Sequence, residues 1–457
     1  MMLTLRRLLL PLACLTLLTT CMVWERMSGA QFFVGIDDVE SGDSAAPASP
    51  DRALRGDSAP TPAPASATAP GIASSDPHDW TFCLNVGNVC DFDGIRDVRL
   101  VATNGAYVIE PNVSGFPGIA CAGYGFSKKL VGTPARCEFG PLKTLTMRNP
   151  TPGMIFGSTF TVPLGDTGFT RAIANNTSFV GNPVQDGMGA FRTTCNLAKF
   201  AFDDPMVYPN QPGASHLHMF FGNVGIGAGS TTESLSKTGA STCRGGILNR
   251  SAYWIPALYD SVTKQVVIPR FGQFYYKSGS NVDVTLTQDI PTGLRIIAGD
   301  KNATGMQQGI FWACGGVNQT PYIPDCENGV STLTLSIEFP PCWNGKDLDS
   351  PDHHSHMAHV IYRNPPERSH CPPTHPVQLP MINEQFDFPI RAGDRHDRWR
   401  LSSDMYPTTL RGGRSAHADW MLGWDEPTMH SIVVNCLRKG LDCGVGTIGN
   451  GKELGVP

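Results

Sequence analysis

Histidine is unevenly distributed in this chain, and its placement is the best clue to chemistry. Eleven of the twelve histidines lie between His216 and His430, most of them in short polar motifs that read SHLH, DSPDHHSHMAH, CPPTHP and HADWMLGWD. Near neutral pH an imidazole can ligate a metal, transfer a proton or hydrogen-bond a sugar hydroxyl. The motifs therefore predict one site assembled from segments that are distant in sequence.

The SHLH motif has the spacing of a metal-binding pair. On a strand, His216 and His218 project from the same face, about 6–7 Å apart along the chain. Such a pair can share one metal or one substrate, although two polar residues on a solvated sheet face would give the same pattern. Asp204 lies just upstream, where it can orient a histidine or form an Asx turn before Pro205.

Two further motifs add proton-transfer groups. In DSPDHHSHMAH, His353 and His356 can fall on one turn, with Asp352 as a ligand or an orienting carboxylate. In HADWMLGWD, His417 and Asp419 share a face of an extended segment and offer a base with a partner carboxylate. The candidate catalytic residues are His216, His218, Asp352, His353, His356, His417 and Asp419.

A metal or a sugar could occupy this site. Three imidazole nitrogens and one open position would allow a zinc or copper ion to act as a Lewis acid or to activate water. The candidate metal ligands are His216, His218, His356 and His417. The candidate substrate-binding residues are Asp204, Trp254, Tyr276, His375 and Trp424, of which the tryptophans can stack on sugar rings or lie buried in a β core.

Other classes of function are disfavoured. The balance of 35 basic and 40 acidic residues shows no basic stripe, so nucleic acid is not an expected partner. No P-loop, dinucleotide fingerprint, GxSxG or HExxH motif is found. Without Cys14 and Cys21, twelve cysteines remain and no CxxC pair exists, which predicts up to six disulfides rather than zinc thiolates.

The N-terminus predicts export. Residues 1–30 carry Arg6 and Arg7 before an apolar run, as in a signal peptide or an N-terminal anchor. Any membrane contact is expected only through this segment, if it stays uncleaved or is lipidated. Residues 31–77 are rich in Pro, Ala and Ser and predict a disordered linker. The protein is thus expected to be secreted or associated with the cell envelope.

The remainder predicts a mainly β protein. Residues 78–145 read as a small disulfide-rich β module that resembles a WxFC…CxFxG accessory module of secreted bacterial proteins, either glycan-binding or a spacer. Residues 146–188 read as connecting strands and loops. Residues 189–450 read as a large, disulfide-stapled, jelly-roll-like β-sandwich. One segment, Pro427 to Lys439, has the apolar spacing of a helix.

Four strings in the main domain resemble a secreted fungal and bacterial family known only as a domain of unknown function. The strings are DDPMVYPNQPGASHLHMFFGN, CWNGKDLDSPDHHSHMAHV, CPPTHPVQLP and HADWMLGWD, spanning about 200 to 436. The fungal pattern has HGD where this chain has His417-Ala418-Asp419. The resemblance implies that the motif positions are Asp204, His216, His218, Asp352, His353, His356, His375, His417 and Asp419.

The combined features favour an exported enzyme that acts on extracellular polysaccharide through a histidine- and aspartate-rich site. A metal-free site would use the same side chains for hydrolysis or β-elimination by proton transfer. The alternatives are a non-catalytic protein that binds glycan or cell wall, and an exported metal-binding protein.

Overall fold

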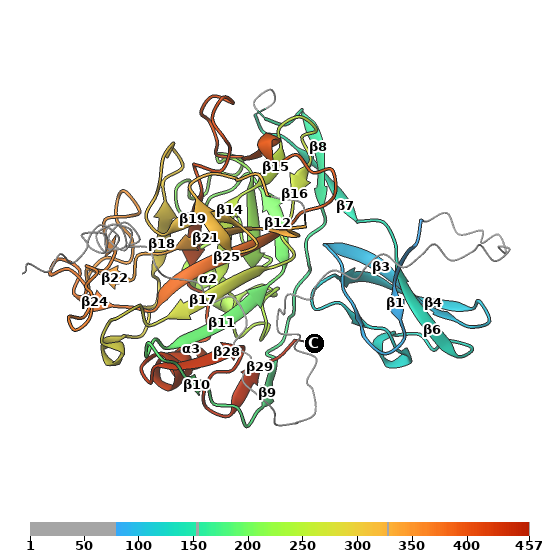
Figure 1. Cartoon of the computed structure of the whole chain (residues 1–457), viewed down its shortest axis with the longest axis horizontal. Helices are drawn as coiled ribbons and strands as arrows, with labels where there is room; N and C mark the ends of the chain where they lie inside the picture. The colour runs from blue at the N-terminus through green and yellow to red at the C-terminus, as the bar shows by residue number, and fades with distance from the viewer. Residues whose placement is uncertain (1–78, 152–154, 327–328, 457) are drawn as a thin grey trace, which may run out of the picture. The chain divides into compact units, whose positions relative to one another are not determined.

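The computed structural model describes residues 79–151, 155–326 and 329–456. Two antiparallel-dominated sheets face each other and enclose the main core (Figure 1). The eight-stranded sheet has the order β10 (Asn182–Pro183), β28 (Leu441–Val445), β11 (Ala190–Cys195), β17 (Gly272–Lys277), β25 (Met381–Pro389), β21 (Thr332–Glu338), β19 (Ile310–Cys314) and β20 (Val317–Thr320). Only the β11–β28 pair of this sheet is parallel.

The second sheet carries two of the histidine motifs. It has five antiparallel strands in the order β12 (Leu197–Ala201), β13 (His218–Gly222), β14 (Ala252–Pro256), β27 (His417–Met421) and β18 (Arg295–Gly299). Strands β13 and β27 both pair with β14, so one strand separates the two motifs. This arrangement brings segments that are far apart in sequence within side-chain reach of each other.

Alternation along each strand decides which side chains enter the space between the sheets. From the five-stranded sheet, Met219 and Phe221 of β13, Tyr253 of β14 and Trp420 of β27 belong to the main core. Tyr253 stacks on Phe274 of the facing sheet with ring centroids 3.7 Å apart. The protein is therefore a β-sandwich, and the intervening residues of β13 and β27 point to the opposite, outer face.

Shorter elements surround the sandwich. The small sheets are β16 (Val266–Val267), β15 (Leu258–Asp260) and β26 (Trp399–Leu401); β23 (Met357–Ala358), β22 (Cys342–Trp343) and β24 (Val377–Gln378); β29 (Lys452–Leu454) with β9 (Ala174–Asn176); and β7 (Thr144–Arg148) with β8 (Thr159–Pro163). The helical segments are η1 (Gly123–Gly125), α2 (Thr232–Lys237), η2 (Val284–Leu286), η3 (His396–Arg398), α3 (Glu426–Ile432) and η4 (Val433–Leu437). The helix expected at Pro427 to Lys439 is present as α3 and η4, whereas α2 was not anticipated.

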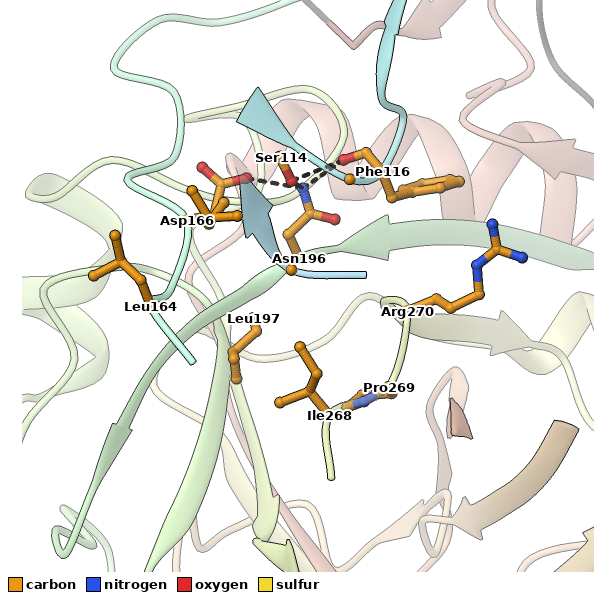
Figure 2. Close-up of a pocket in the computed structure, with 12 residues that line it drawn as sticks. Ser114, Phe116, Leu164, Asp166, Asn196, Leu197, Ile268, Pro269 and Arg270 are labelled. Carbon is orange, nitrogen blue, oxygen red and sulfur yellow. Dashed lines mark hydrogen bonds between the residues drawn. The ribbon is translucent and has the colours of Figure 1, made fainter. Parts of the chain in front are cut away.

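Residues 81–139 form a smaller β unit with its own apolar cluster. A four-stranded sheet has the order β1 (Thr81–Asn85), β6 (Pro134–Phe139), β3 (Ile95–Ala102) and β4 (Tyr107–Ser114), beside the pair β2 (Val89–Cys90) and β5 (Ile119–Ala120). Asn196 contacts this unit: its Nδ2 lies within hydrogen-bond distance of Ser114 Oγ and of the Phe116 carbonyl, and also of Asp166 Oδ2 outside the unit (Figure 2). The cavity there measures about 20 Å³, which suits a water molecule and no larger ligand.

Six disulfides join all twelve cysteines of the described chain, as the sequence predicts. The pairs are Cys83–Cys90, Cys121–Cys137, Cys195–Cys243, Cys314–Cys326, Cys342–Cys371 and Cys436–Cys443. Such a set is typical of proteins that fold in an oxidising, extracellular compartment. Among the described residues, no helix has the length and apolar character needed to cross a membrane. The expected signal peptide or anchor and the expected linker lie outside the described residues.

Candidate metal centre

Three imidazole rings meet on the outer face of the five-stranded sheet. The ring centroids of His216 and His218 are 4.2 Å apart, those of His216 and His417 5.1 Å, and those of His218 and His417 6.1 Å. Each ring offers one nitrogen, and the three nitrogens lie within 4.8 Å of one another. His218 and His417 are buried at 0% and 5% exposure, so these groups are removed from bulk solvent.

Strand alternation explains why these rings share a face. Ala418 and Trp420 of β27 point into the inter-sheet core, which leaves His417 and Asp419 on the outer face. Met219 points inward from β13 in the same way, and His218 beside it points outward. The His-x-Asp pair therefore lies on β27 as expected for a β-strand, whereas His216 lies two residues before β13 begins.

Hydrogen bonds fix the orientation of two rings. His218 Nδ1 lies 2.9 Å from the Asp203 carbonyl, and His417 Nδ1 lies 2.8 Å from the Ser415 carbonyl. A carbonyl oxygen only accepts, so each Nδ1 carries the proton and donates it. In the neutral imidazole, Nε2 then keeps its lone pair, which is the arrangement of metal-ligating histidines.

Several polar atoms of this cluster are buried without a partner. Among the residues that the structure describes, His216 Nε2, His218 Nε2 and Asp419 Oδ2 have no hydrogen bond. An unsatisfied buried polar group typically costs about 1–3 kcal/mol, and more when it is charged. One divalent cation would satisfy these atoms together, so the donor set fits a metal ion.

Two carboxylates join the same centre. Oxygens of Asp204 and Asp419 lie within 4.8 Å of each other and of a nitrogen of His218. Because Nδ1 of His218 is hydrogen-bonded to the Asp203 carbonyl, Nε2 must serve both this group and the three-histidine group. The two groups therefore share His218, and together they gather five candidate donors.

The electrostatics of the cluster favour a cation. Burial lowers the pKa of His218 and that of His417 to about 4, and holds the pKa of His216 well below its ordinary value. Burial also raises the pKa of Asp419, and the neighbouring Asp204 raises it further. Neutral imidazoles beside a buried carboxylate lack a positive charge, and a bound cation would supply it.

The Asp204 side chain stabilises the turn that follows it and also lies in the candidate donor group. Its Oδ1 accepts hydrogen bonds from the backbone N–H groups of Met206 and Val207, at 3.0 and 2.9 Å. Burial raises the pKa of Asp204, and these two hydrogen bonds oppose that rise. The expected Asx turn is present, whereas the expected orientation of a histidine by this carboxylate stays a prediction, because His218 Nδ1 is held by the Asp203 carbonyl.

A histidine–aspartate pair lies on the neighbouring loop. His353 Nδ1 donates to Asp349 at 2.9 Å, and Asp349 also accepts from Arg295 Nε at 2.9 Å. His353 adopts a left-handed backbone with φ of 59°, which is costly for a residue other than glycine.

Two residues of the same motif have structural partners instead. His356 is fully buried: Nε2 lies 2.9 Å from the Arg295 carbonyl and Nδ1 lies 2.9 Å from Ser350 Oγ. Both ring nitrogens are used, and His356 is not among the grouped donors of the described chain. Asp352 accepts from Ser350, His354 and Ser355, which hold the pKa of its carboxyl far below the usual range. The expected four-histidine set is thus reduced to three.

The predicted substrate-binding residues are dispersed. Trp254 and Tyr276 have 0% exposure and therefore no surface for a ligand, which corrects the expectation of a sugar contact at either position. His375 Nε2 lies 3.0 Å from the Ser355 carbonyl, which ties CPPTHP to the His353 loop. Trp424 lines a separate cavity of about 660 Å³ beyond the opposite end of β27 from His417.

Sequence reasoning missed several residues that shape the centre. Asp203 and Ser415 act through backbone carbonyls, and such a role leaves no signature in side-chain type. Lys301, whose charge lowers the pKa of His216 and His417, lies outside every motif. Asp349 opens the DSPDHHSHMAH string, so a carboxylate four residues before His353 was a usable signal.

Comparison with protein families identifies the part of the chain that holds this centre. A family model described as a domain of unknown function (DUF1996) matches residues 204–424. Residues 204–424 form a DUF1996 domain. Searches of curated proteins and of solved structures gave no significant match. All five donors of the centre, from Asp204 to Asp419, lie inside the DUF1996 domain, whereas β10, β11, β12 and β28 lie outside it.

Proposed function

We propose that the protein is an exported enzyme that acts on extracellular polysaccharide through a mononuclear zinc or copper centre. His216, His218 and His417 would hold the ion. The observation that carries the proposal is the convergence of these three imidazoles, two of which keep buried Nε2 atoms without a partner among the described residues. A cluster of this kind is costly to bury unless something binds it.

The bound ion would supply Lewis-acid or water-activating chemistry. Asp419 and Asp204 are placed either to complete the coordination or to accept a proton from a water at the centre. His353 is the proposed proton-transfer residue, since Asp349 holds its Nδ1 and leaves Nε2 with the lone pair. Asp349 and Arg295 act through His353 and are positioning residues.

The proposed compartment and substrate rest on different observations. Six disulfides support folding outside the cytoplasm, and the apolar run behind Arg6 and Arg7 supports export. The proposed substrate rests on the histidine- and aspartate-rich site, whose side chains suit hydrolysis or elimination by proton transfer, and on the resemblance to a secreted family.

The first test is metal analysis of the full chain purified without a histidine tag. We expect about one zinc or copper ion per chain, retained through dialysis and removed by a chelator. His218→Ala and His417→Ala should lose the ion, whereas the exposed His370→Ala should keep it. A wild-type chain that neither contains nor takes up zinc or copper overturns the metal centre.

The second test separates an enzyme from a binder. Cell-wall polysaccharides are incubated with the metal-loaded chain and scored for new reducing ends, released acids or unsaturated products. Product formation that His218→Ala abolishes supports the proposal. Retention of a polysaccharide without any product would instead support a glycan-binding protein, and metal binding without either would support a metal-binding protein.

A further inference from the structure

An apolar pocket that is partly open to the surface adjoins the candidate metal centre. It measures about 170 Å³, and His216 forms part of its wall. The other wall residues that matter here are Phe156, Phe202, Ser215, Leu217 and Met405. The cavity is distinct from the 660 Å³ cavity at Trp424, with which it shares no lining residue.

Two polar side chains in the wall, Asn149 and Ser402, are engaged by other groups of the protein. Asn149 Nδ2 donates to the Phe156 carbonyl, and Asn149 Oδ1 accepts from the backbone of Thr151. Ser402 Oγ donates to the Leu217 carbonyl and accepts from the Ala257 backbone. Ser215 Oγ and His216 Nε2, in contrast, are buried and have no partner in the described part of the chain.

Size and polarity together select the occupant. An apolar cavity of about 150 Å³ holds a benzene molecule. A bare sugar ring would bring several hydroxyl groups into these walls, and each hydroxyl left without a partner costs about 1–3 kcal/mol. The cavity therefore matches an apolar group of about the size of benzene that offers one hydrogen-bonding atom to Ser215.

We propose that this cavity binds an aromatic-sized acyl group that is ester-linked to the polysaccharide, and that it presents the ester to the centre at His216. This inference rests on the proposed function and names its substrate class. In the reaction, the oxygen of water bonds to the acyl carbon while the bond from that carbon to the sugar oxygen breaks. The sugar oxygen takes one proton of the water, and the released carboxylic acid keeps the other.

Binding is tested first, because it needs no activity. Fluorobenzene and 4-fluorophenol are titrated into the full metal-loaded chain and followed by fluorine NMR. Both probes should bind, with 4-fluorophenol about 3- to 10-fold tighter owing to one hydrogen bond with Ser215. Ser215→Ala should remove that difference in affinity and leave the affinity for fluorobenzene unchanged. Ala214→Leu adds three carbons to the cavity wall and should lower the affinity for both probes at least 10-fold.

Hydrolysis is tested next with methyl benzoate and methyl acetate. The ratio of kcat/KM should favour benzoate by more than 10-fold in the wild type, and Ala214→Leu should abolish that preference. Metal content is measured on every sample. A failure of the proposed metal centre can then be distinguished from a failure of the proposed acyl-binding cavity. Absence of probe binding, or equal binding to wild type and Ala214→Leu, overturns the cavity even if the metal is present. Probe binding to a chain that holds no metal leaves the cavity standing and overturns the enzyme.

Discussion

At the scale of single residues, the centre is defined as much by backbone carbonyls as by side chains. Asp203 and Ser415 each accept the Nδ1 proton of a histidine and thereby direct Nε2 toward the shared point. Asp419 brings a buried carboxylate to the same place without a hydrogen bond of its own on Oδ2 among the described residues. A cluster with these properties is costly on its own and becomes favourable around a cation.

A second unusual carboxylate lies in the core between the sheets, and it predicts a pH effect. Glu384 is 0% exposed, and both its oxygens lack a partner within the described ranges. Burial raises the pKa of Glu384, and Asp419 raises it further. The folded state therefore binds this proton more tightly than the unfolded state, and stability falls as pH rises above about 4.5 toward the raised value.

Glu384→Gln should remove this loss, because Gln matches the shape of the protonated acid. As the pH rises above about 4.5, the free energy of unfolding of the variant should gain on that of the wild type by about 1.4 kcal/mol per pH unit, up to the raised pKa of Glu384. Urea unfolding at several pH values measures this difference. Parallel pH profiles for the two proteins would contradict the protonated state of Glu384.

Residue types alone could not assign every role correctly. The pair His417 with Asp419 was predictable, because alternation along a strand depends only on local spacing, whereas His216 lies before β13 and reaches the cluster from outside the strand. His356 is not a candidate metal ligand because its two ring nitrogens are hydrogen-bonded to the Arg295 carbonyl and to Ser350. Trp254 is buried because other segments of the chain cover the outer face of the five-stranded sheet. Tertiary contacts of this kind leave no mark in a single motif.

At the scale of elements, a short loop controls one of the three rings. Asp404 accepts from the backbone of Leu401 and Gly413 at 2.9 and 2.7 Å, and from Ser415 Oγ at 2.6 Å. It therefore ties the end of β26 to the residue whose carbonyl orients His417. The segment between β26 and β27 acts as a support for the centre.

Asp404→Asn should weaken metal binding without removing a ligand. Asn lacks one of the acceptor oxygens, so the loop loosens and His417 loses its fixed orientation. We expect the zinc affinity to fall about 10- to 100-fold, as for other partners of metal-ligating histidines. Competition with a chelating dye measures the affinity. The exposed Asp397→Asn is the matched control, and equal affinities for the two variants would contradict the supporting role of Asp404.

Elements were predictable where periodicity is strong. The helix at Pro427 to Lys439 was expected from its apolar spacing and is present as α3 and η4. Helix α2 spans only Thr232–Lys237, with one buried residue, Leu235, so it offers no periodic pattern to detect. It forms instead through a capping box at Thr231 and through packing on the outer face.

At the scale of the whole molecule, the sandwich is held by its core and by disulfides that tie long loops to it. Cys342–Cys371 spans 29 positions and closes the loop that carries His353, His356 and the link to His375. Closing a loop of this length stabilises a fold by about 2–4 kcal/mol in the chain-entropy model.

Replacement of Cys342 and Cys371 by Ser should therefore lower the unfolding free energy of the main domain by about 2–4 kcal/mol. Urea unfolding followed by tryptophan fluorescence gives the value. The pair Cys83–Cys90 lies in the smaller β unit, so the same replacement there should leave the main transition unchanged. An unchanged midpoint after loss of Cys342–Cys371 would contradict the contribution of this disulfide.

The pairing of β13 and β27 with the same neighbour has a consequence for when the centre exists. His417 follows His218 by 199 residues in the sequence, so an unfolded chain offers only the local pair of His216 and His218. Unlike a small zinc-templated fold, this sandwich must assemble before all three imidazoles meet. Ion uptake would then come last, and the proportion of loaded chains would report how much of a preparation has completed folding.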